Sequence, residues 1–347
     1  PVGDAALITP WNLPLYLLSW KMAPALAMGN TVVAKPSELT PLTADALAQV
    51  LEELGVPPGV FNLVHGYGHE VGQSLVEHPL TGLVSFTGGT ATGEKVASAA
   101  APRFKKLSLE LGGKNPTLVF ADRFTPDTVQ GVARASFLNQ GQICLCGSRI
   151  LVEESIHDRF IESLSKEIKT WKIGPPQTEG VRFGSLSSHA HLEKVESYVR
   201  LAREEGGKVV HGGNRPAMSA PYDKGAFFEP TIITGLKSSC RSATEEIFGP
   251  VVTVHPFKTE QEAVEIANEV RYGLSASVWT ADLNRAHRVS RNLEAGTVWV
   301  NTWLLRDLRV PFGGMKDSGV GREGGEHSLD FFSELKNVCV RIEETGV

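Results

Sequence analysis

The sequence contains few cysteines. Four occur among 347 residues, Cys144, Cys146, Cys240 and Cys339, and they are too few for a disulfide framework in a chain of this length. A zinc site takes about four ligands, and Cys240 and Cys339 have no partner at metal-ligand spacing, so no metal is predicted. The low cysteine content is typical of a reducing compartment, and we expect a cytoplasmic protein.

Long apolar runs and a strong charge of one sign are also absent. No apolar run approaches the ~20 residues of a membrane-spanning helix. The net charge of -5 and the isoelectric point near 6.1 give no electrostatic reason to expect nucleic acid or an anionic membrane as a partner. We therefore expect neither.

An initiator methionine is absent too. The chain begins with Pro1 and enters an apolar segment, "DAALITP", at once, without a visible signal or transit peptide. We therefore expect a piece of a longer protein whose N-terminal part is missing. Its 347 residues still suffice for two domains and a large buried core.

Short apolar runs alternate with amphipathic segments from residue 4 to about residue 120. This alternation predicts a doubly wound α/β sheet with helices on both faces. The expected strands are 4–10, 31–38, 60–66, 82–88 and 105–113, and the expected helices are 13–28, 42–54, 70–77 and 93–101.

A second α/β pattern follows a boundary expected near Gly112 and Gly113. Its expected strands are 115–120, 149–152, 208–211, 231–234, 251–257, 275–279 and 297–300, and its expected helices are 126–138, 156–169, 189–205, 260–269 and 282–293. The apolar alternation "NVCVRI" (337–342) predicts an edge strand near the C-terminus.

Polar or glycine-rich segments follow five strands of the first pattern: "PWN", "KPSE", "HGYG", "FTGG" and "LELGG". Ligands of doubly wound sheets bind at the carboxyl ends of the strands. Either glycine loop, Gly66–Gly72 or Gly88–Gly93, is explained alone by turn chemistry. Together they indicate backbone N–H groups and a helix N-terminus that face a pyrophosphate.

The segment "KPSE" supplies Lys35 and Glu38 at a neighbouring strand end. A carboxylate there can accept both ribose hydroxyls, which favours NAD over a 2′-phosphorylated cofactor. The alternative is a solvated Lys–Glu pair that opens a helix, with Ser37 as its cap.

Glu110 lies in the apolar segment "LSLELGG". A buried, unpaired carboxylate is costly, and burial raises its pKa, which suits a general base near neutral pH. The alternative is a strand-end glutamate that points to water.

Cys144 and Cys146 lie in "NQGQICLCGSR". A disulfide between them would close a small, strained ring. Both could pack as small hydrophobic side chains. However, the polar, flexible setting of Cys144 is typical of a thiol nucleophile, which needs a polarised pocket.

These motifs, with "EEIFGPV" and "PFGGMKDSGVGRE", occur in the order and spacing of the aldehyde dehydrogenase superfamily, which the whole chain resembles. Glu110 and Cys144 are 34 residues apart (144 − 110), as in the catalytic pair of that family. The resemblance implies a Rossmann-type NAD-binding domain (1–112), an α/β catalytic domain (113–317), a return segment (318–334) and an oligomerisation strand (335–347).

The resemblance also implies site residues. Cys144 resembles the nucleophile that forms a thiohemiacetal and a thioester, Glu110 the base that activates water, and Asn12 part of the oxyanion hole, together with the backbone N–H of Cys144. The implied NAD-binding residues are Trp11, Lys35, Ser37, Glu38, Gly68, Gly88, Gly89, Gly112, Glu246 and Phe248. Many relatives carry serine where Gly89 stands, so one hydroxyl contact to phosphate is absent here.

The loop "NTWLLRDLRVPFGG" most resembles that of dehydrogenases for 2-aminomuconic and 2-hydroxymuconic semialdehydes. The resemblance makes Arg306 and Phe312 substrate-binding residues, and a planar guanidinium suits a substrate carboxylate. The alternative is a surface pair of each arginine with Asp307 or a glutamate, which we expect for Arg309. Two further alternatives are an enzyme for simple aliphatic aldehydes and an inactive fragment or scaffold.

Overall fold

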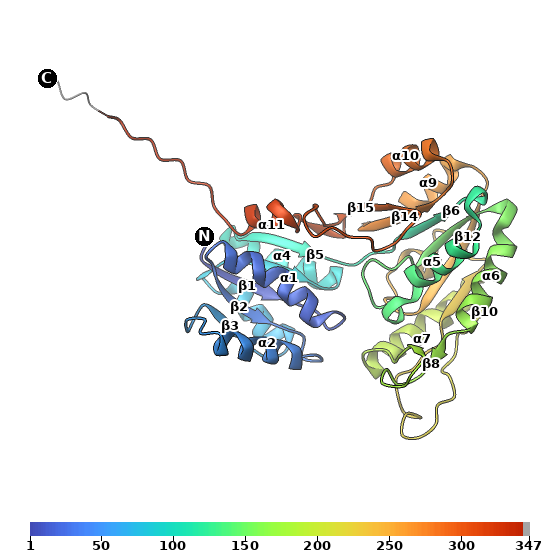
Figure 1. Cartoon of the computed structure of the whole chain (residues 1–347), viewed down its shortest axis with the longest axis horizontal. Helices are drawn as coiled ribbons and strands as arrows, with labels where there is room; N and C mark the ends of the chain where they lie inside the picture. The colour runs from blue at the N-terminus through green and yellow to red at the C-terminus, as the bar shows by residue number, and fades with distance from the viewer. Residues whose placement is uncertain (343–347) are drawn as a thin grey trace.

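The structure is a computed structural model that describes residues 1–342. Its chain forms two lobes, each built on one β-sheet (Figure 1). The first sheet has the order β17-β5-β4-β1-β2-β3. Its parallel strands are β1 (Asp4–Ile8), β2 (Thr31–Lys35), β3 (Phe61–Leu63), β4 (Thr81–Thr87) and β5 (Lys106–Glu110). The predicted strands therefore exist and share one carboxyl edge.

The helices of the first lobe connect these parallel strands. They are α1 (Pro14–Ala27), α2 (Leu42–Glu53), α3 (Gln73–Glu77) and α4 (Thr90–Ala100). The predicted start of α4 at residue 93 is wrong. The helix begins directly after Gly89, and Gly93 lies within it, where a Cβ atom would be 2.5 Å from Leu111 Cδ2.

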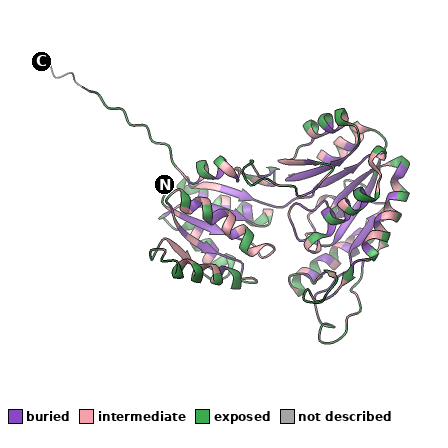
Figure 2. Ribbon diagram, viewed as in Figure 1, coloured by how far each residue is buried: buried purple, intermediate pink, exposed green. Residues whose placement is uncertain are grey.

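The second sheet has the order β10-β11-β12-β7-β6-β14-β15 and is parallel except for β10. Its central strands are buried between helices, whose outer faces are exposed (Figure 2). The strands are β6 (Pro116–Val119), β7 (Arg149–Glu153), β10 (Lys208–His211), β11 (Thr231–Thr234), β12 (Val251–Phe257), β14 (Ser275–Trp279) and β15 (Thr297–Val300). The helices are α5 (Pro126–Phe137), α6 (His157–Lys169), α7 (His189–Glu204), α9 (Glu260–Asn268) and α10 (Leu283–Asn292).

A short connection between the two sheets determines which edges of the sheets face each other. The chain leaves β5 at its carboxyl end, Glu110, and enters β6 at its amino end, Pro116, after five residues. The carboxyl edge of the first sheet therefore faces the amino edge of the second. The loop that carries Cys144 precedes β7, so it lies at this junction as well.

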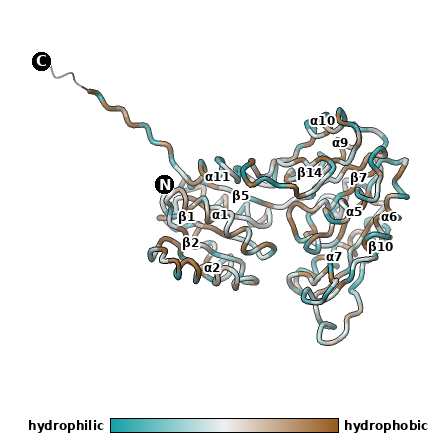
Figure 3. Tube along the Cα trace, in the orientation of Figure 1, coloured by the Kyte–Doolittle hydropathy of each residue, from teal (hydrophilic) through white to brown (hydrophobic). Residues whose placement is uncertain are grey.

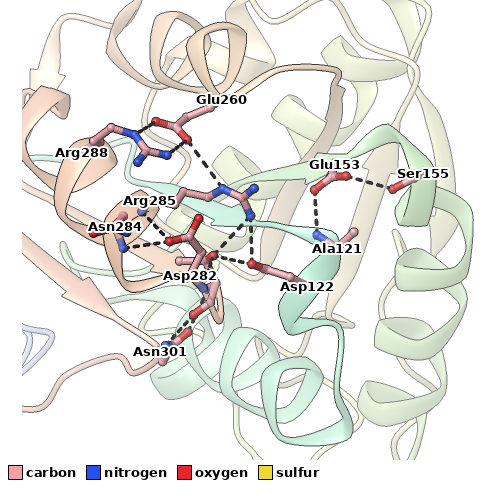
Figure 4. A network of polar contacts seen from close by, with 11 residues as sticks. Ala121, Asp122, Glu153, Ser155, Glu260, Asp282, Asn284, Arg285, Arg288 and Asn301 are labelled. Atoms are coloured by element: carbon pink, nitrogen blue, oxygen red, sulfur yellow. Dashed lines mark hydrogen bonds and ion pairs between the residues drawn. The ribbon is translucent and has the colours of Figure 1, made fainter.

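The carboxyl edge of the second sheet is closed by ion pairs (Figure 4). Arg285 lies 3.0 Å from Asp122 and 3.6 Å from Glu260, and Arg288 lies 2.9 Å from Glu260. Asp282 caps α10 by accepting from two backbone N–H groups. The groups at this edge bind one another, so the network stabilises the lobe rather than offering a ligand site.

The C-terminal segment returns to the first lobe. Strand β17 (Gly319–Val320) pairs antiparallel with β5, and helix α11 (Gly325–Phe331) follows it. Beyond it, residues 335–342 extend away from the body with alternating hydropathy, and they form no strand with either sheet of this chain (Figure 3). The expected edge strand thus has no partner among the described residues, and residues 343–347 of the expected oligomerisation strand lie outside them. Within residues 1–342, no helix is both long and apolar enough to cross a bilayer.

Candidate active site

Two adjoining cavities lie at the junction of the sheets, and Cys144 lines both. The larger has a volume of about 730 Å³, and its lining includes Glu110, Tyr16, Trp20, Arg306, Phe312 and Glu323. The smaller has a volume of about 220 Å³, and its lining includes Trp11, Asn12, Gly88, Gly89, Gly112, His191, Lys194, Glu246 and Phe248. The structure thus brings most of the predicted site residues together around one thiol.

The Asn115 side chain binds the backbone of the loop that carries Cys144. The Asn115 side-chain amide donates to the carbonyl oxygens of Cys144 (2.6 Å) and Cys146 (2.9 Å). Cys146 is buried among apolar residues, as expected for a packed neighbour. Both cysteines are free thiols, and the described residues hold no cluster of potential metal ligands.

The electrostatics of this pocket keep the Cys144 thiol protonated. Burial raises its pKa above the ordinary value, and the charges of Glu110 and Glu246 raise it further, against a smaller opposing effect of Arg306. The sequence predicts a pocket suited to a thiolate, whereas burial and the two carboxylates of the folded pocket disfavour one. A nucleophile here must therefore lose its proton to a neighbouring base as it attacks.

Glu110 ends β5 with its carboxyl group buried, which excludes the alternative of a solvent-facing glutamate. Its Oε1 atom has no hydrogen-bond partner. Burial raises the pKa of Glu110 well above its ordinary value, and the neighbouring Glu323 raises it further, while Lys21 and Arg306 act in the opposite direction. Such a carboxyl group can hold or take a proton near neutral pH.

A buried ion pair, which the sequence did not predict, lies behind Glu110. Lys21 Nζ lies 2.5 Å from Glu323 Oε1, and both side chains are buried. Trp20 Nε1 donates to the other oxygen of Glu323 at 2.7 Å. Trp20 lies four residues after Tyr16 on the face of α1 that lines the larger cavity, but this spacing does not predict the contact between Lys21 and Glu323.

Asn12 links the end of β1 to the nucleophile loop. Its side-chain amide donates to the carbonyl oxygen of Gln142 at 3.0 Å, and Asn139 donates to the backbone oxygen of Asn12 at 3.2 Å. An amide nitrogen carries two hydrogens, so the second remains for an oxyanion beside Cys144. The geometry is compatible with the predicted oxyanion-hole role.

The first turn of α4 offers free backbone donors to the smaller cavity. Gly89 is the N-cap and supplies no side-chain acceptor, and a Cβ atom on it would meet nothing within 4 Å. The first N–H groups of a helix lack partners within that helix and favour anions. The open space and free donors fit a dinucleotide pyrophosphate, as expected from the "FTGG" loop.

Glu246 and Phe248 enter the same cavity from the second lobe. The Glu246 carboxylate accepts from the backbone N–H of Gly113 at 2.8 Å. A Cβ atom on Gly112 would lie 2.5 Å from Glu246 Oε2, so this glycine allows the close approach. Burial raises the pKa of Glu246, while the charges of nearby lysines lower it.

The remaining predicted cofactor residues lie outside both cavities, along the carboxyl edge of the first sheet. Lys35 is buried, donates to the Pro36 carbonyl oxygen and lies 3.7 Å from Glu38. The alternative of a solvated pair with Ser37 as helix cap is wrong, because α2 begins only at Leu42. Gly68 begins the helical turn Gly68–Gly72.

His191 and Lys194 also line the smaller cavity. Neither residue is among those predicted for the site from the sequence. The structure places the His191 ring edge-on to Trp11, with centroids 5.2 Å apart. Helical spacing from residue 191 to 194 was the available signal for both residues.

Arg306 lies in the larger cavity against three aromatic rings. Its guanidinium carbon is 4.3 Å from the centroid of Phe312, 5.2 Å from that of Trp20 and 5.9 Å from that of Tyr16. No carboxylate of residues 1–342 forms an ion pair with it. Arg309, as expected, pairs with Asp307 at the surface, at 2.6 Å.

Several known proteins resemble this chain over most of its length. The model of the "Aldehyde dehydrogenase family" matches residues 1–338. Human "2-aminomuconic semialdehyde dehydrogenase" is 52% identical over 343 residues, 98% of this chain and 70% of that protein. The 2-hydroxymuconic semialdehyde dehydrogenase of Pseudomonas putida is 50% identical over 99% of this chain and 71% of its own length.

A solved structure of betaine aldehyde dehydrogenase from Staphylococcus aureus in complex with NAD+ superposes with a TM-score of 0.94 at 44% identity. The match covers 96% of this chain and 66% of that one, so the chain spans about two thirds of that protein. The predicted fold, the oxidoreductase class and NAD as cofactor are confirmed at the level of the family. The chain belongs to the aldehyde dehydrogenase family.

Proposed function

We propose that the protein oxidises an aldehyde that carries a carboxylate, of the type of 2-aminomuconic semialdehyde, to the corresponding acid with NAD. The observation that carries the substrate class is Arg306. A guanidinium that forms no ion pair with a carboxylate of residues 1–342, in a cavity lined by aromatic rings, is the group that a carboxylate binds bidentately. The relatives for aminomuconic and hydroxymuconic semialdehydes support this choice.

Addition is the first chemical step of the proposed reaction. The Cys144 sulfur attacks the aldehyde carbon, and its proton passes to a base as the carbon–sulfur bond forms. The Asn12 amide and the Cys144 N–H then stabilise the oxyanion. The bound NAD supplies the acceptor for the hydride that leaves this carbon, which converts the adduct into a thioester on Cys144.

Hydrolysis completes the cycle. Glu110 takes a proton from a water molecule, which attacks the thioester carbon and releases the acid and the thiol. Glu246 and Phe248 would hold the nicotinamide ribose and ring, the α4 N-terminus the pyrophosphate, and Lys35 and Glu38 the adenosine ribose. Arg306 would orient the substrate so that its aldehyde reaches Cys144.

The test compares substrates in two arginine variants. We expect Arg306→Ala to lower kcat/KM for 2-aminomuconic semialdehyde by about 10²-fold, because a charge-assisted bidentate contact is lost, and to change turnover of hexanal little. Arg309→Ala is the matched control, because Arg309 is exposed and already paired with Asp307. Equal losses on both aldehydes in Arg306→Ala would contradict the carboxylate clamp.

Two alternatives remain distinguishable. A 2-hydroxymuconic semialdehyde carries the same carboxylate, so only the ratio of kcat/KM values separates it from the amino compound. An inactive fragment or scaffold would form no NADH with either. The exposed Leu335, Val338, Val340 and Ile342 support a homo-oligomer in which this segment extends a neighbour's sheet. The free thiols support a cytoplasmic location.

A further inference from the structure

Phe248 has an unusual backbone conformation. Its φ is +60°, a region that bulky residues adopt only when their surroundings impose it. Its carbonyl oxygen accepts a hydrogen bond of 2.6 Å from His191 Nε2. The rings of Phe248 and Trp11 lie edge-on, with centroids 5.4 Å apart. The strained residue is therefore bound on both its backbone and its side chain.

Helix α7 also contacts residues on both sides of Phe248 in the sequence. The Tyr198 hydroxyl donates to Glu245 Oε2 at 2.7 Å. Val195 packs on Gly249, where a Cβ atom would lie 2.5 Å from Val195 Cγ2. Positions 191, 195 and 198 lie on one face of the helix because they are four and three residues apart.

The same helix is anchored to the nucleophile loop. The backbone N–H of Ser187, just before α7, donates to the side-chain oxygen of Gln142 at 3.0 Å. Ser188 caps the helix by accepting from the N–H of His191. The helix therefore sets the distance between the Cys144 loop and residues 245–249.

We propose that His191 is a positioning residue for the cofactor: by binding the Phe248 carbonyl from α7, it holds the Phe248 ring in the cavity beside Cys144. The inference rests on the proposed use of NAD. It assigns His191 no contact with the reacting atoms. It explains why a helix outside the predicted site carries residues that line the cavity.

The experiment uses the full chain with His191→Leu, which removes the donor, His191→Gln, which can restore one, and His189→Leu, an exposed control in the same turn. Loss of a hydrogen bond that opposes backbone strain should weaken NADH binding about tenfold in His191→Leu. Titration by NADH fluorescence should show recovery in His191→Gln and no change in His189→Leu. Unaltered affinity in His191→Leu would overturn the proposal.

A readout without cofactor separates this inference from the proposed function. Crystal structures of wild type and His191→Leu should show Phe248 leaving the left-handed region only in the variant; an unchanged φ would overturn the proposal. Wild type that binds no NADH would refute the proposed function, while the Phe248 conformation still decides the role of His191. If His191→Leu does not fold, Gly249→Ala should displace Phe248 and weaken NADH binding, and adding Val195→Ala should restore both; failure of this rescue would also overturn it.

Discussion

Gly141, in the loop that carries Cys144, contacts Gly249, which follows the cavity-lining Phe248. A Cβ atom on Gly141 would lie 2.2 Å from the Gly249 carbonyl oxygen, and Gly141 has a φ of +70°. The loop that presents Cys144 and the segment that presents Phe248 therefore meet through two backbones. A backbone contact therefore joins the loop of the proposed nucleophile to the segment that lines the proposed cofactor site.

Gly141→Ala should destabilise this contact. The added methyl meets a backbone oxygen and requires an unfavourable φ, so we expect the free energy of unfolding to fall by roughly 2–3 kcal/mol. Chemical denaturation measures the change. Gly89→Ala, whose Cβ meets open space and whose φ is -72°, is the matched control; an equal loss there would contradict the contact argument.

The pH dependence of thioester hydrolysis should report Glu110. Only the carboxylate form accepts a proton, and the pKa of Glu110 is raised well above its ordinary value, chiefly by burial. Single-turnover hydrolysis should therefore increase with pH through a transition above the usual carboxylate range. Glu323→Gln removes a charge that raises this pKa, so the transition should move to lower pH.

Absence of any shift in Glu323→Gln would show that Glu323 does not act on Glu110. Glu110→Gln, which cannot titrate, is the control and should remove the transition altogether.

The buried Lys21–Glu323 pair should matter most when only one partner is removed. Lys21→Met leaves a buried carboxylate without its cation, and we expect a loss of about 3–5 kcal/mol in unfolding free energy at neutral pH. Adding Glu323→Leu should recover part of that loss. A double-mutant cycle measures the coupling, and strictly additive losses would show that the pair contributes nothing specific.

The ion network of the second lobe should support stability without affecting chemistry. Arg285 also stacks on Phe120, with its guanidinium carbon 4.6 Å from the ring centroid. Arg285→Ala should lower the unfolding free energy by about 1 kcal/mol and leave turnover unchanged. A selective loss of activity at unchanged stability would mean that this edge does take part in function.

The parallel strands of both sheets and the common carboxyl edge of the first sheet could be predicted from the sequence, because apolar runs and turn residues are local signals. The start of α4 was misplaced because Gly89 caps it without a side-chain oxygen, the usual signal for a helix start. The expectation that Cys144, Glu110 and Asn12 share one site rests on the resemblance to the aldehyde dehydrogenase superfamily, and the structure places Glu110 and Asn12 in the two cavities that Cys144 lines.

Contacts between distant segments could not be predicted. Glu323 meets Lys21 across about 300 residues, and His191 on α7 meets Phe248 in the segment between β11 and β12. The pKa of Cys144 depends on Glu110, Glu246 and the depth of the pocket, none of which is visible in the segment "NQGQICLC". Its raised pKa, opposite to the expected polarised thiolate, is therefore a property of the folded chain alone.

Intact-protein mass spectrometry of Glu110→Gln, mixed with NAD and 2-aminomuconic semialdehyde, shows whether Cys144 carries the acyl group. With hydrolysis blocked, we expect one equivalent of NADH per active chain, formed in a burst, and an acyl adduct that peptide mapping places on Cys144. NADH formed without an adduct, or an adduct on Cys146 or elsewhere instead of Cys144, would contradict this expectation.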